Sequence, residues 1–129
     1  MSKEFIILVC GDRLWEDRQL VWSILDDVTE GNYWHNTFII EGGAKGADTC
    51  GREWAKMIGC GHKTYSADWE RYGKAAGPIR NSEMLEIGQP ELVLAFHSDI
   101  EKSKGTKDMI QRANKAGIEV RLYGAREES

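Results

Sequence analysis

Short apolar runs recur along the chain, separated by segments with helical periodicity. The strongest runs are FIILVC (5–10), TFII (37–40) and LVLAF (92–96), and weaker runs lie at 62–66 and 118–123. The strong runs are continuously apolar rather than alternating, a pattern typical of strands covered on both faces of a sheet. The chain therefore predicts buried strands in a parallel sheet.

Apolar residues with a spacing near 3.6 mark helices between these runs. Their stripes are Leu20, Val21, Ile24, Leu25 and Val28, then Cys50, Trp54, Met57 and Ile58, and finally Met109, Ile110 and Ala113. A further helix is expected to begin at Pro78, to run through Met84, Leu85 and Ile87, and to end at Gly88. The resulting order, β-α-β-α-β-α-β-α-β, predicts an α/β fold with a doubly wound parallel sheet of about five strands.

Length and composition restrict the classes of protein. A chain of 129 residues with 41% hydrophobic content fits one domain, expected over residues 1–124 with a polar tail at 125–129. The net charge of −4 argues against a broadly basic surface, so nucleic acid is a disfavoured partner. The run at 5–10 is too short for a signal-peptide core or a membrane span, so no membrane association is expected.

The chain has three cysteines, Cys10, Cys50 and Cys60. Their odd number and their lack of zinc-ligand or CxxC spacing indicate thiols in a reducing cytoplasm. We expect no metal site, and the sequence calls for no cofactor.

Ligands of open parallel sheets bind beyond the carboxyl ends of the strands, where the strand order reverses. The segments that follow the expected strands are 11–15, 41–48, 67–81 and 97–106. Several of them carry glycine at a strand exit or a helix entry, where bare backbone amides can approach a ligand closely. Candidate binding residues are therefore sought in these segments.

The segment EGGAKGAD (41–48) is the most distinctive of them. It lacks the dinucleotide pattern GxGxxG, because Ala44 replaces the second glycine, and it lacks the GK[ST] ending of a P-loop. Its small residues leave amides uncovered at the positive end of a helix, where a phosphate or carboxyl group could dock. The alternative is a short turn in which Asp48 interacts with the first helical turn, and the spacing leaves both interpretations open.

Two helix starts contain further candidate anion donors. Arg80 and Asn81 follow Pro78 in the expected first turn of their helix, and an arginine there offers forked donors suited to a phosphate. A solvated surface arginine is the alternative. Gly105 and Thr106 open the last helix in the same manner, with Thr106 as a cap or a phosphate ligand.

Acidic and aromatic residues at the same edge are candidates with weaker signals. Asp12, Asp48 and Asp68 lie near strand exits, and Asp68 falls about twenty residues after the glycine loop, where dinucleotide folds commonly place a ribose-binding carboxylate. Each is more often a turn or cap residue. Trp15, Trp69 and Tyr72 lie in the same segments and are candidates to stack on a base, although aromatic residues at loop edges usually cover the core. His97 follows a strand at this edge, but no nucleophile or metal partner gives it a catalytic role.

Several segments taken together resemble a known family. The segments are CGDRLWED, EGGAKGADTCGREWA, ADWERYGKAAGPIRNSEM, LVLAFHSD and KGTKDMIQRANKAGIEV. In this order, and along nearly the whole chain, they resemble the small YspA-like, cpYpsA-related members of the SLOG superfamily. That superfamily consists of Rossmann-like domains that bind nucleotides or nucleotide-derived molecules, and it includes the DNA-processing protein DprA and the LOG phosphoribohydrolases. The resemblance implies a Rossmann-like fold and a ligand of this class.

The resemblance also implies a set of ligand-binding residues. With the candidates above, this set is Gly11, Asp12, Arg13, Gly42, Gly43, Ala44, Gly46, Asp48, Asp68, Trp69, Arg80, Asn81, His97, Gly105 and Thr106. LOG enzymes carry PGGxGTxxE in the last loop, with a glutamate used in hydrolysis. Here Met109 stands at the glutamate position, and Asp108 lies one residue before it, about 100° around the helix.

The leading functional hypothesis is a cytoplasmic protein that binds an ADP-ribose-like or nucleoside monophosphate-like molecule. It would act as a sensor or sequester a signal nucleotide, in a setting such as phage or bacterial defence. Relatives commonly form dimers or larger assemblies, so a homo-oligomer is expected. The alternatives are a LOG-type nucleotide N-glycosidase, with Asp12, Asp48 or Asp68 as the acid, and single-strand DNA binding in the manner of DprA. Met109 disfavours the LOG reaction, but the sequence leaves catalysis open.

Overall fold

The fold is built on five parallel strands. The computed structural model describes residues 4–30 and 36–124, and within them the strands are β1 (Phe5–Gly11), β2 (Thr37–Glu41), β3 (Gly61–Thr64), β4 (Leu92–Phe96) and β5 (Glu119–Tyr123). They form one sheet in the order β3-β2-β1-β4-β5. Strands β2 and β3 lie on one side of β1, and β4 and β5 lie on the other side. The strand order therefore reverses between β1 and β4, as in a doubly wound fold. The predicted strands and the predicted fold class are confirmed.

The central strand β1 shows why the apolar runs are continuous. Ile7 pairs with Ile39 of β2 on one side and with Leu92 of β4 on the other. Ile7, Leu8 and Val9 are all fully buried, although successive side chains point to opposite faces of the sheet. Both faces must therefore be covered, and an apolar residue is required at every position.

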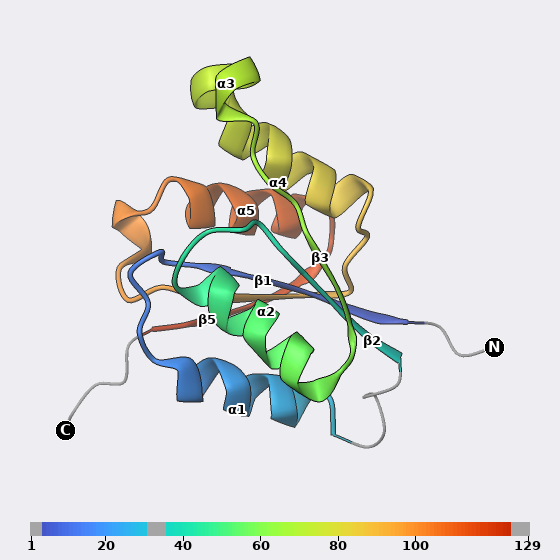
Figure 1. The fold of residues 1–129 in the computed structure, drawn as a ribbon. Helices are drawn as coiled ribbons and strands as arrows, with labels where there is room; N and C mark the ends of the chain where they lie inside the picture. Colours follow the sequence, from blue (N-terminus) through green and yellow to red (C-terminus); the bar gives the residue numbers. More distant parts are fainter. Residues whose placement is uncertain (1–3, 31–35, 125–129) are drawn as a thin grey trace.

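Two helices cover each face of the sheet (Figure 1). Helices α1 (Arg18–Val28) and α2 (Ala47–Ile58) pack on the face that carries Ile7 and Val9, while α4 (Ala76–Glu86) and α5 (Gly105–Lys115) pack on the face that carries Leu8. Burying each large apolar side chain contributes roughly 1.5–3 kcal/mol. The two apolar layers hold the sheet rigidly beneath the loops at its carboxyl edge.

The structure differs from the prediction in the boundaries of one helix and in three short additional elements. Helix α4 begins at Ala76, two residues before Pro78, and ends at Glu86. Between β3 and α4 the structure adds a short helix, α3 (Trp69–Tyr72), and a 3-10 turn, η2 (Gly73–Ala75). A second 3-10 turn, η3 (Ile100–Lys102), precedes α5. These short elements bury no residue, so they leave no apolar pattern in the sequence.

Met57, which the pattern placed on the apolar stripe of its helix, is 60% exposed, and Ile87, which was expected within the next helix, is 65% exposed. The buried face of α2 instead includes Gly51 and Ala55, on the other side of Trp54. Because small residues give a weak apolar signal, the predicted stripe lies too far around the helix. Ile87 lies just beyond the last residue of α4.

The expected single domain over residues 1–124 stays a prediction, and the expected tail at 125–129 lies outside the described residues. Within the described residues, no helix is both long enough and apolar enough to cross a membrane.

Candidate functional site

A cleft of about 410 Å³ lies beyond the carboxyl ends of β1 and β4, where the strand order reverses. It is the location at which open α/β sheets bind ligands. The cleft brings together residues from four separate segments of the chain. Its predicted members are Gly11, Asp12, Arg13, Ala44, Asp48, Arg80, Asn81, His97, Gly105 and Thr106.

The exit of β1 forms one wall and runs close to β4. The amide of Asp12 donates to the carbonyl of Phe96 at 2.8 Å. A Cβ atom on Gly11 would lie 2.2 Å from the same oxygen, so only glycine permits this approach. Gly11 therefore shapes the cleft by allowing two strand exits to meet.

The glycine loop after β2 is stabilised by the two acids that flank it. The carboxylate of Asp48 accepts from the amides of Gly42 at 2.9 Å and of Ala44 at 3.3 Å. The amide of Gly43 donates to the carboxylate of Glu41 at 2.7 Å. The prediction that this loop presents uncovered amides is therefore wrong for Gly42, Gly43 and Ala44, because carboxylates of the protein already occupy them.

Gly46 marks the point where the glycine loop crosses the loop after β1. Its φ is +76°, and a Cβ atom there would lie 2.3 Å from the carbonyl oxygen of Asp12. The next amide, of Ala47, donates to that same oxygen at 3.2 Å. Gly46 thus joins two walls of the site through the backbone.

Asp48 is an acid with a buried side chain and a raised pKa. It is 5% exposed, and burial raises the pKa of its carboxyl to about 6, against the hydrogen bonds from Ala44 and Gly42, which lower it. The sequence offered, as the alternative, a short turn in which Asp48 interacts with the first helical turn; instead its carboxylate accepts from amides of the loop that precedes α2. Asp48 thus organises the loop that leads into its own helix, and it also lines the cleft.

Arg80 comes from α4, in its second turn rather than the predicted first. Its Nη1 donates to the carbonyl of Gly42 at 2.7 Å, and its Nε donates to Oδ1 of Asn81 at 3.0 Å. Its Nη2 has no hydrogen-bond partner among the described residues. The protein thus fixes the guanidinium by two nitrogens and leaves the third for another acceptor.

Asn81 is 3% exposed, and its side chain makes its hydrogen bonds within the protein. Its Nδ2 donates to the carbonyl of Gly105 at 3.2 Å and to the carboxylate of Asp108 at 3.0 Å. Asp108 also pairs with Nε of Arg112 at 2.8 Å. Asn81 therefore links α4 to the start of α5 and orients Arg80.

The start of α5 closes the other side of the cleft. The amide of Thr106 donates to Oγ of Ser103 at 3.0 Å, and the buried side chain of Met109 lines the cleft. Asp108 is engaged with Asn81 and Arg112 and does not line the cleft. The position that matches the LOG glutamate is thus occupied by a thioether, and the neighbouring acid is turned away from it.

His97 lies at the exit of β4. Its Nδ1 accepts from the amide of Asp99 at 2.9 Å, which leaves Nε2 directed toward Oδ2 of Asp12, 3.9 Å away. The other oxygen of Asp12 accepts from the amide of Leu14 at 2.9 Å. The cleft therefore holds a histidine and a carboxylate near each other.

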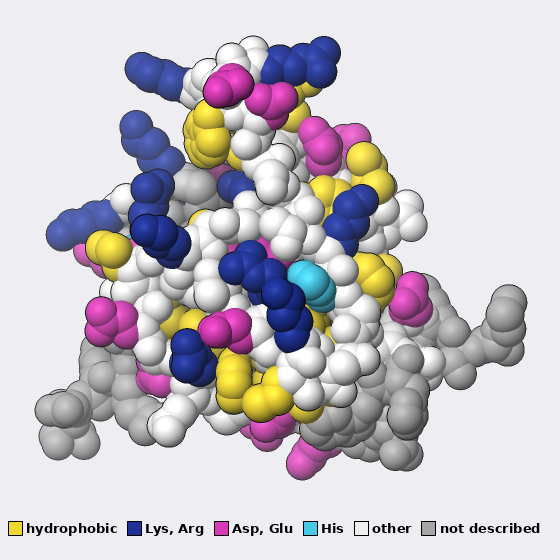
Figure 2. All heavy atoms as spheres, in the orientation of Figure 1, with side chains coloured by type: hydrophobic (Ala, Val, Ile, Leu, Met, Phe, Trp, Pro, Cys, Tyr) yellow, Lys and Arg dark blue, Asp and Glu magenta, His cyan; other side chains and the backbone are white. Residues whose placement is uncertain are grey.

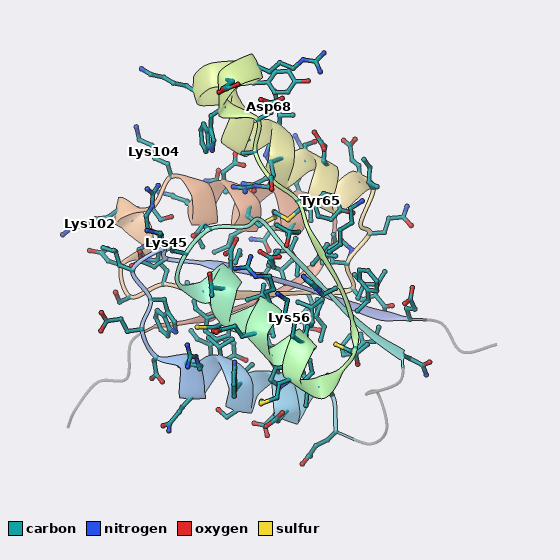
Figure 3. The ribbon with its side chains drawn as sticks, viewed as in Figure 1. Lys45, Lys56, Tyr65, Asp68, Lys102 and Lys104 are labelled. Atoms are coloured by element: carbon teal, nitrogen blue, oxygen red, sulfur yellow. The ribbon has the colours of Figure 1, made fainter. Side chains whose placement is uncertain are left out.

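The cations of the cleft outnumber its acids. Arg13, Arg80, Lys102 and Lys104 line it, against Asp12 and Asp48, although the whole chain has a net charge of −4. Figure 3 labels Lys102, Lys104 and also Lys45 on the same side of the molecule, and Figure 2 shows Lys and Arg side chains gathered at that edge. A concentration of positive charge at a concave site favours an anionic ligand.

The structure does not bring every predicted residue into the cleft. Gly42, Gly43 and Gly46 lie in its supporting loop, and Asp68 caps α3 by accepting from the amide of Arg71 at 3.1 Å. Trp69 lies on α3, outside the cleft. Residues that the sequence did not single out as ligand candidates are Cys10, Met84, Lys102, Ser103, Lys104 and Met109. Lys102 and Lys104 belong to segment 97–106, which the sequence analysis had named as a strand exit without selecting its lysines.

The thiol of Cys10 lies in the cleft wall but is not a nucleophile at neutral pH. Burial raises its pKa well above the ordinary value, and the Asp48 carboxyl adds to this rise. The thiol therefore stays protonated. The described residues contain no group of three or more His, Cys, Asp or Glu arranged to hold a metal ion.

Comparisons with known proteins agree with this architecture. The family model described as "YspA, cpYpsA-related SLOG family" matches residues 5–72. The Gene 61 protein of Mycobacterium phage D29 is 36% identical over 124 residues, which cover 92% of this chain and 95% of that protein. The chain belongs to the YspA, cpYpsA-related SLOG family.

A solved structure shares the fold. The DNA processing protein A (DprA) of Streptococcus pneumoniae superposes with a TM-score of 0.70 at 18% identity, covering 93% of this chain and 50% of the DprA chain. The present chain thus spans half the length of that protein. At this level of identity the likeness shows the fold alone.

Proposed function

We propose that the cleft binds an anionic, nucleotide-derived small molecule of the ADP-ribose or nucleoside monophosphate type. The observation that carries the proposal is the cationic cleft at the reversal of the strand order, in a chain that is acidic as a whole. Membership of the SLOG family supports it, since binding of such molecules is what the resemblance to that superfamily implies. The protein would act as a sensor of the ligand or would sequester it.

The geometry suggests how a phosphate would be held. Nη2 of Arg80 is held near the cleft by the two hydrogen bonds of the same guanidinium, so little conformational entropy is lost on binding. The exposed side chains of Lys102, the last residue of η3, and Lys104, the residue before α5, line another wall of the cleft, and Nζ of Lys102 also lies 3.6 Å from the carboxylate of Asp99. A phosphate between Arg80 and these lysines would receive charge from both walls.

Binding is favoured over cleavage by the same residues. An N-glycosidic bond breaks through an oxocarbenium-like state that a carboxylate must stabilise, or with the help of a base that activates water. Met109 supplies neither function, and the carboxylate of Asp48 is engaged by two amides. The protein therefore offers strong groups for holding a phosphate and few for the chemistry.

Calorimetric titration with ADP-ribose, ADP and AMP tests the proposal. The informative variant is Lys102→Ala/Lys104→Ala, which removes two cations from the cleft, and the control is Lys56→Ala on α2, labelled in Figure 3, which removes one cation outside the cleft. Exposed ion pairs contribute about 0.2–1 kcal/mol each, so the double variant should bind about twofold to thirtyfold more weakly. Arg80→Ala is less suitable, because it also removes the hydrogen bond to Gly42.

The salt dependence gives a second measurement. Removing two cations from the site should also make binding less sensitive to added salt, while Lys56→Ala should leave both affinity and salt dependence unchanged. The proposal is wrong if none of the three ligands binds at millimolar concentration. It is also wrong if the cleft variant and the Lys56 variant weaken binding equally.

A hydrolase of the LOG type is the second candidate, favoured by the pair of Asp12 and His97 in the cleft. Of the three predicted acids, Asp68 caps α3 and Asp48 organises its loop, which leaves Asp12 as the acid nearest to a proton-transfer partner. Chromatography of nucleoside monophosphates after incubation would detect free base. Release of base that Asp12→Asn does not slow would exclude this residue from the reaction.

We further propose that the protein works in the cytoplasm as a homo-oligomer, and that its setting includes phage biology or bacterial defence. The unpaired thiols of Cys10, Cys50 and Cys60 support a reducing compartment. The similarity to a phage protein supports the setting. Light scattering coupled to size-exclusion chromatography would measure the stoichiometry, and a strictly monomeric protein at all concentrations would exclude the oligomer.

A further inference from the structure

Helix α3 carries exposed aromatic side chains. Trp69 is 59% exposed and Tyr72 is 39% exposed. Figure 1 shows α3 standing beyond the start of α4, away from the sheet. Tryptophan is usually well covered in a folded domain, because its large ring gains much by leaving water. An indole held this far open is therefore a candidate contact for something outside the chain.

The position of Trp69 relates it to the cleft. Its ring lies against Gly77, where a Cβ atom would come within 3.3 Å of the indole Cη2. Gly77 precedes Arg80 and Asn81 by one helical turn, about 5.4 Å along the axis. The spacing places Gly77 on the same face of α4 as Arg80, Asn81 and Met84, which line the cleft. Trp69 thus stands at the outer end of the row of cleft residues on α4.

Local hydrogen bonds and a glycine turn fix the position of α3, the helix that carries the Trp69 ring. Asp68 caps α3 through the amide of Arg71, and Gly73, with φ of +54°, turns the chain into η2 and α4. The missing side chain at Gly77 lets the indole approach the helix closely. Because one part of the ring rests on α4 while most of it remains exposed, the protein supports a flat apolar surface that is still available to a partner.

The charges nearby fit the same ligand. Lys104, at another wall of the cleft, extends toward the side on which α3 stands (Figure 3). For a molecule with its phosphate at Arg80 and Lys104, one direction in which the other end can extend is along α4, past Gly77 toward Trp69. A nucleotide has a flat aromatic base at that end, and any base can stack on an indole.

We propose that Trp69 is the base-stacking platform of the cleft and that the ligand is therefore a nucleotide with an unpaired aromatic base, rather than a sugar phosphate alone. The inference rests on the proposed function, which supplies the phosphate end of the ligand. It assigns the base to α3 and the anionic group to Arg80 and the lysines. The base then adds affinity that is independent of charge.

Calorimetric titrations with ADP and with ribose 5-phosphate, which lacks a base, test this assignment. Trp69→Ala should weaken ADP binding by about fivefold to a hundredfold, the range expected when one stacked base loses its aromatic partner, and should leave ribose 5-phosphate unaffected. Trp69→Phe should retain part of the affinity. Tyr72→Ala is the matched control, an exposed aromatic removed from the same helix, and should change neither ligand.

A second variant keeps the indole of Trp69 and changes only its contact with Gly77 on α4. Gly77→Ala places a methyl group 3.3 Å from the indole Cη2, so the ring should shift by a few tenths of an ångström and ADP binding should weaken less than in Trp69→Ala, while ribose 5-phosphate binds as before. The assignment is overturned if wild type binds ribose 5-phosphate as tightly as ADP, or if Trp69→Ala weakens both ligands equally; in either result the phosphate site of the proposed function stands. If wild type binds neither ligand, both proposals fail. If Trp69→Ala changes only the oligomeric state measured by light scattering, the ring belongs to a protein interface and the assignment is wrong.

Discussion

Burial of Asp48, the acid that organises the glycine loop, should make this protein less stable as the pH rises through the pKa of that carboxyl group. Asp48 is buried, and its carboxylate accepts from the amides of Gly42 and Ala44. Asp48→Asn keeps the shape of the side chain and one oxygen that can accept both bonds, but removes the ionisation. The variant therefore isolates the cost of the buried charge.

The pKa of this carboxyl rises from 3.8 to about 6 on folding, chiefly because burial disfavours the charged form. With 1.36 kcal/mol for each pKa unit, the shift corresponds to about 3 kcal/mol. Because the folded pKa is raised, the contribution to stability is full below the unfolded pKa and is lost as pH rises through the folded one. Wild type should lose about 2–3 kcal/mol from this group between pH 4 and pH 7.

The assay is urea unfolding of wild type and Asp48→Asn at a series of pH values. The difference in unfolding free energy, wild type minus variant, should fall by about 2–3 kcal/mol from pH 4 to pH 7, because other titrating groups cancel in the comparison. Asp27→Asn makes the same chemical change at an exposed position on α1 and is the control. Parallel pH profiles for wild type and Asp48→Asn would refute the reasoning.

Other substitutions test the packing around the site. Gly46→Ala and Gly59→Ala both place alanine at positive φ, but only the first brings Cβ against a backbone oxygen, that of Asp12, while Gly59 faces open space. Urea unfolding should therefore show a loss for Gly46→Ala at least about 1–2 kcal/mol greater, since overpacking adds to the backbone cost; equal losses would refute the crossing geometry. Phe96→Ala should lower the free energy of unfolding by about 3–5 kcal/mol, since Phe96 is fully buried against Trp15 and Tyr123. Met109→Leu should cost less than about 1.5 kcal/mol and leave nucleotide binding intact, as expected for a residue that fills space, and abolished binding in calorimetry would contradict that role.

The strands and the main helices could be read from the sequence because their residues meet one strong requirement, burial on both faces of the sheet. Continuous apolar runs such as 5–10 and 92–96 have no other common explanation in a chain of this length. The pattern failed where that requirement is weak. Helix α3 has no apolar stripe, and the stripe that includes Met57 lies beside the face that Gly51 and Ala55 actually define.

The sequence predicted the location of the candidate site but not which of its polar groups are already bonded within the protein. The strand exits follow from the fold, and the cleft lies where the carboxyl ends of β1 and β4 meet. The occupation of the loop amides by Asp48 and Glu41 could not be predicted, because it depends on which acceptors reach the loop in three dimensions. Lys102 and Lys104 give no distinct signal, because a charged loop also fits a solvated surface.

The sequence alone determined the fold class, the family and the edge of the sheet at which the cleft lies, because apolar periodicity and local motifs are properties of neighbouring residues. Only the tertiary structure decided which polar groups are free at that edge. It showed the amides of Gly42, Gly43 and Ala44 bonded to carboxylates of the protein, two nitrogens of Arg80 held by hydrogen bonds, and Asp108 engaged with Asn81 and Arg112. Hydrogen-bond satisfaction depends on distances between segments far apart in the chain, and those distances exist only once the helices have packed on the sheet.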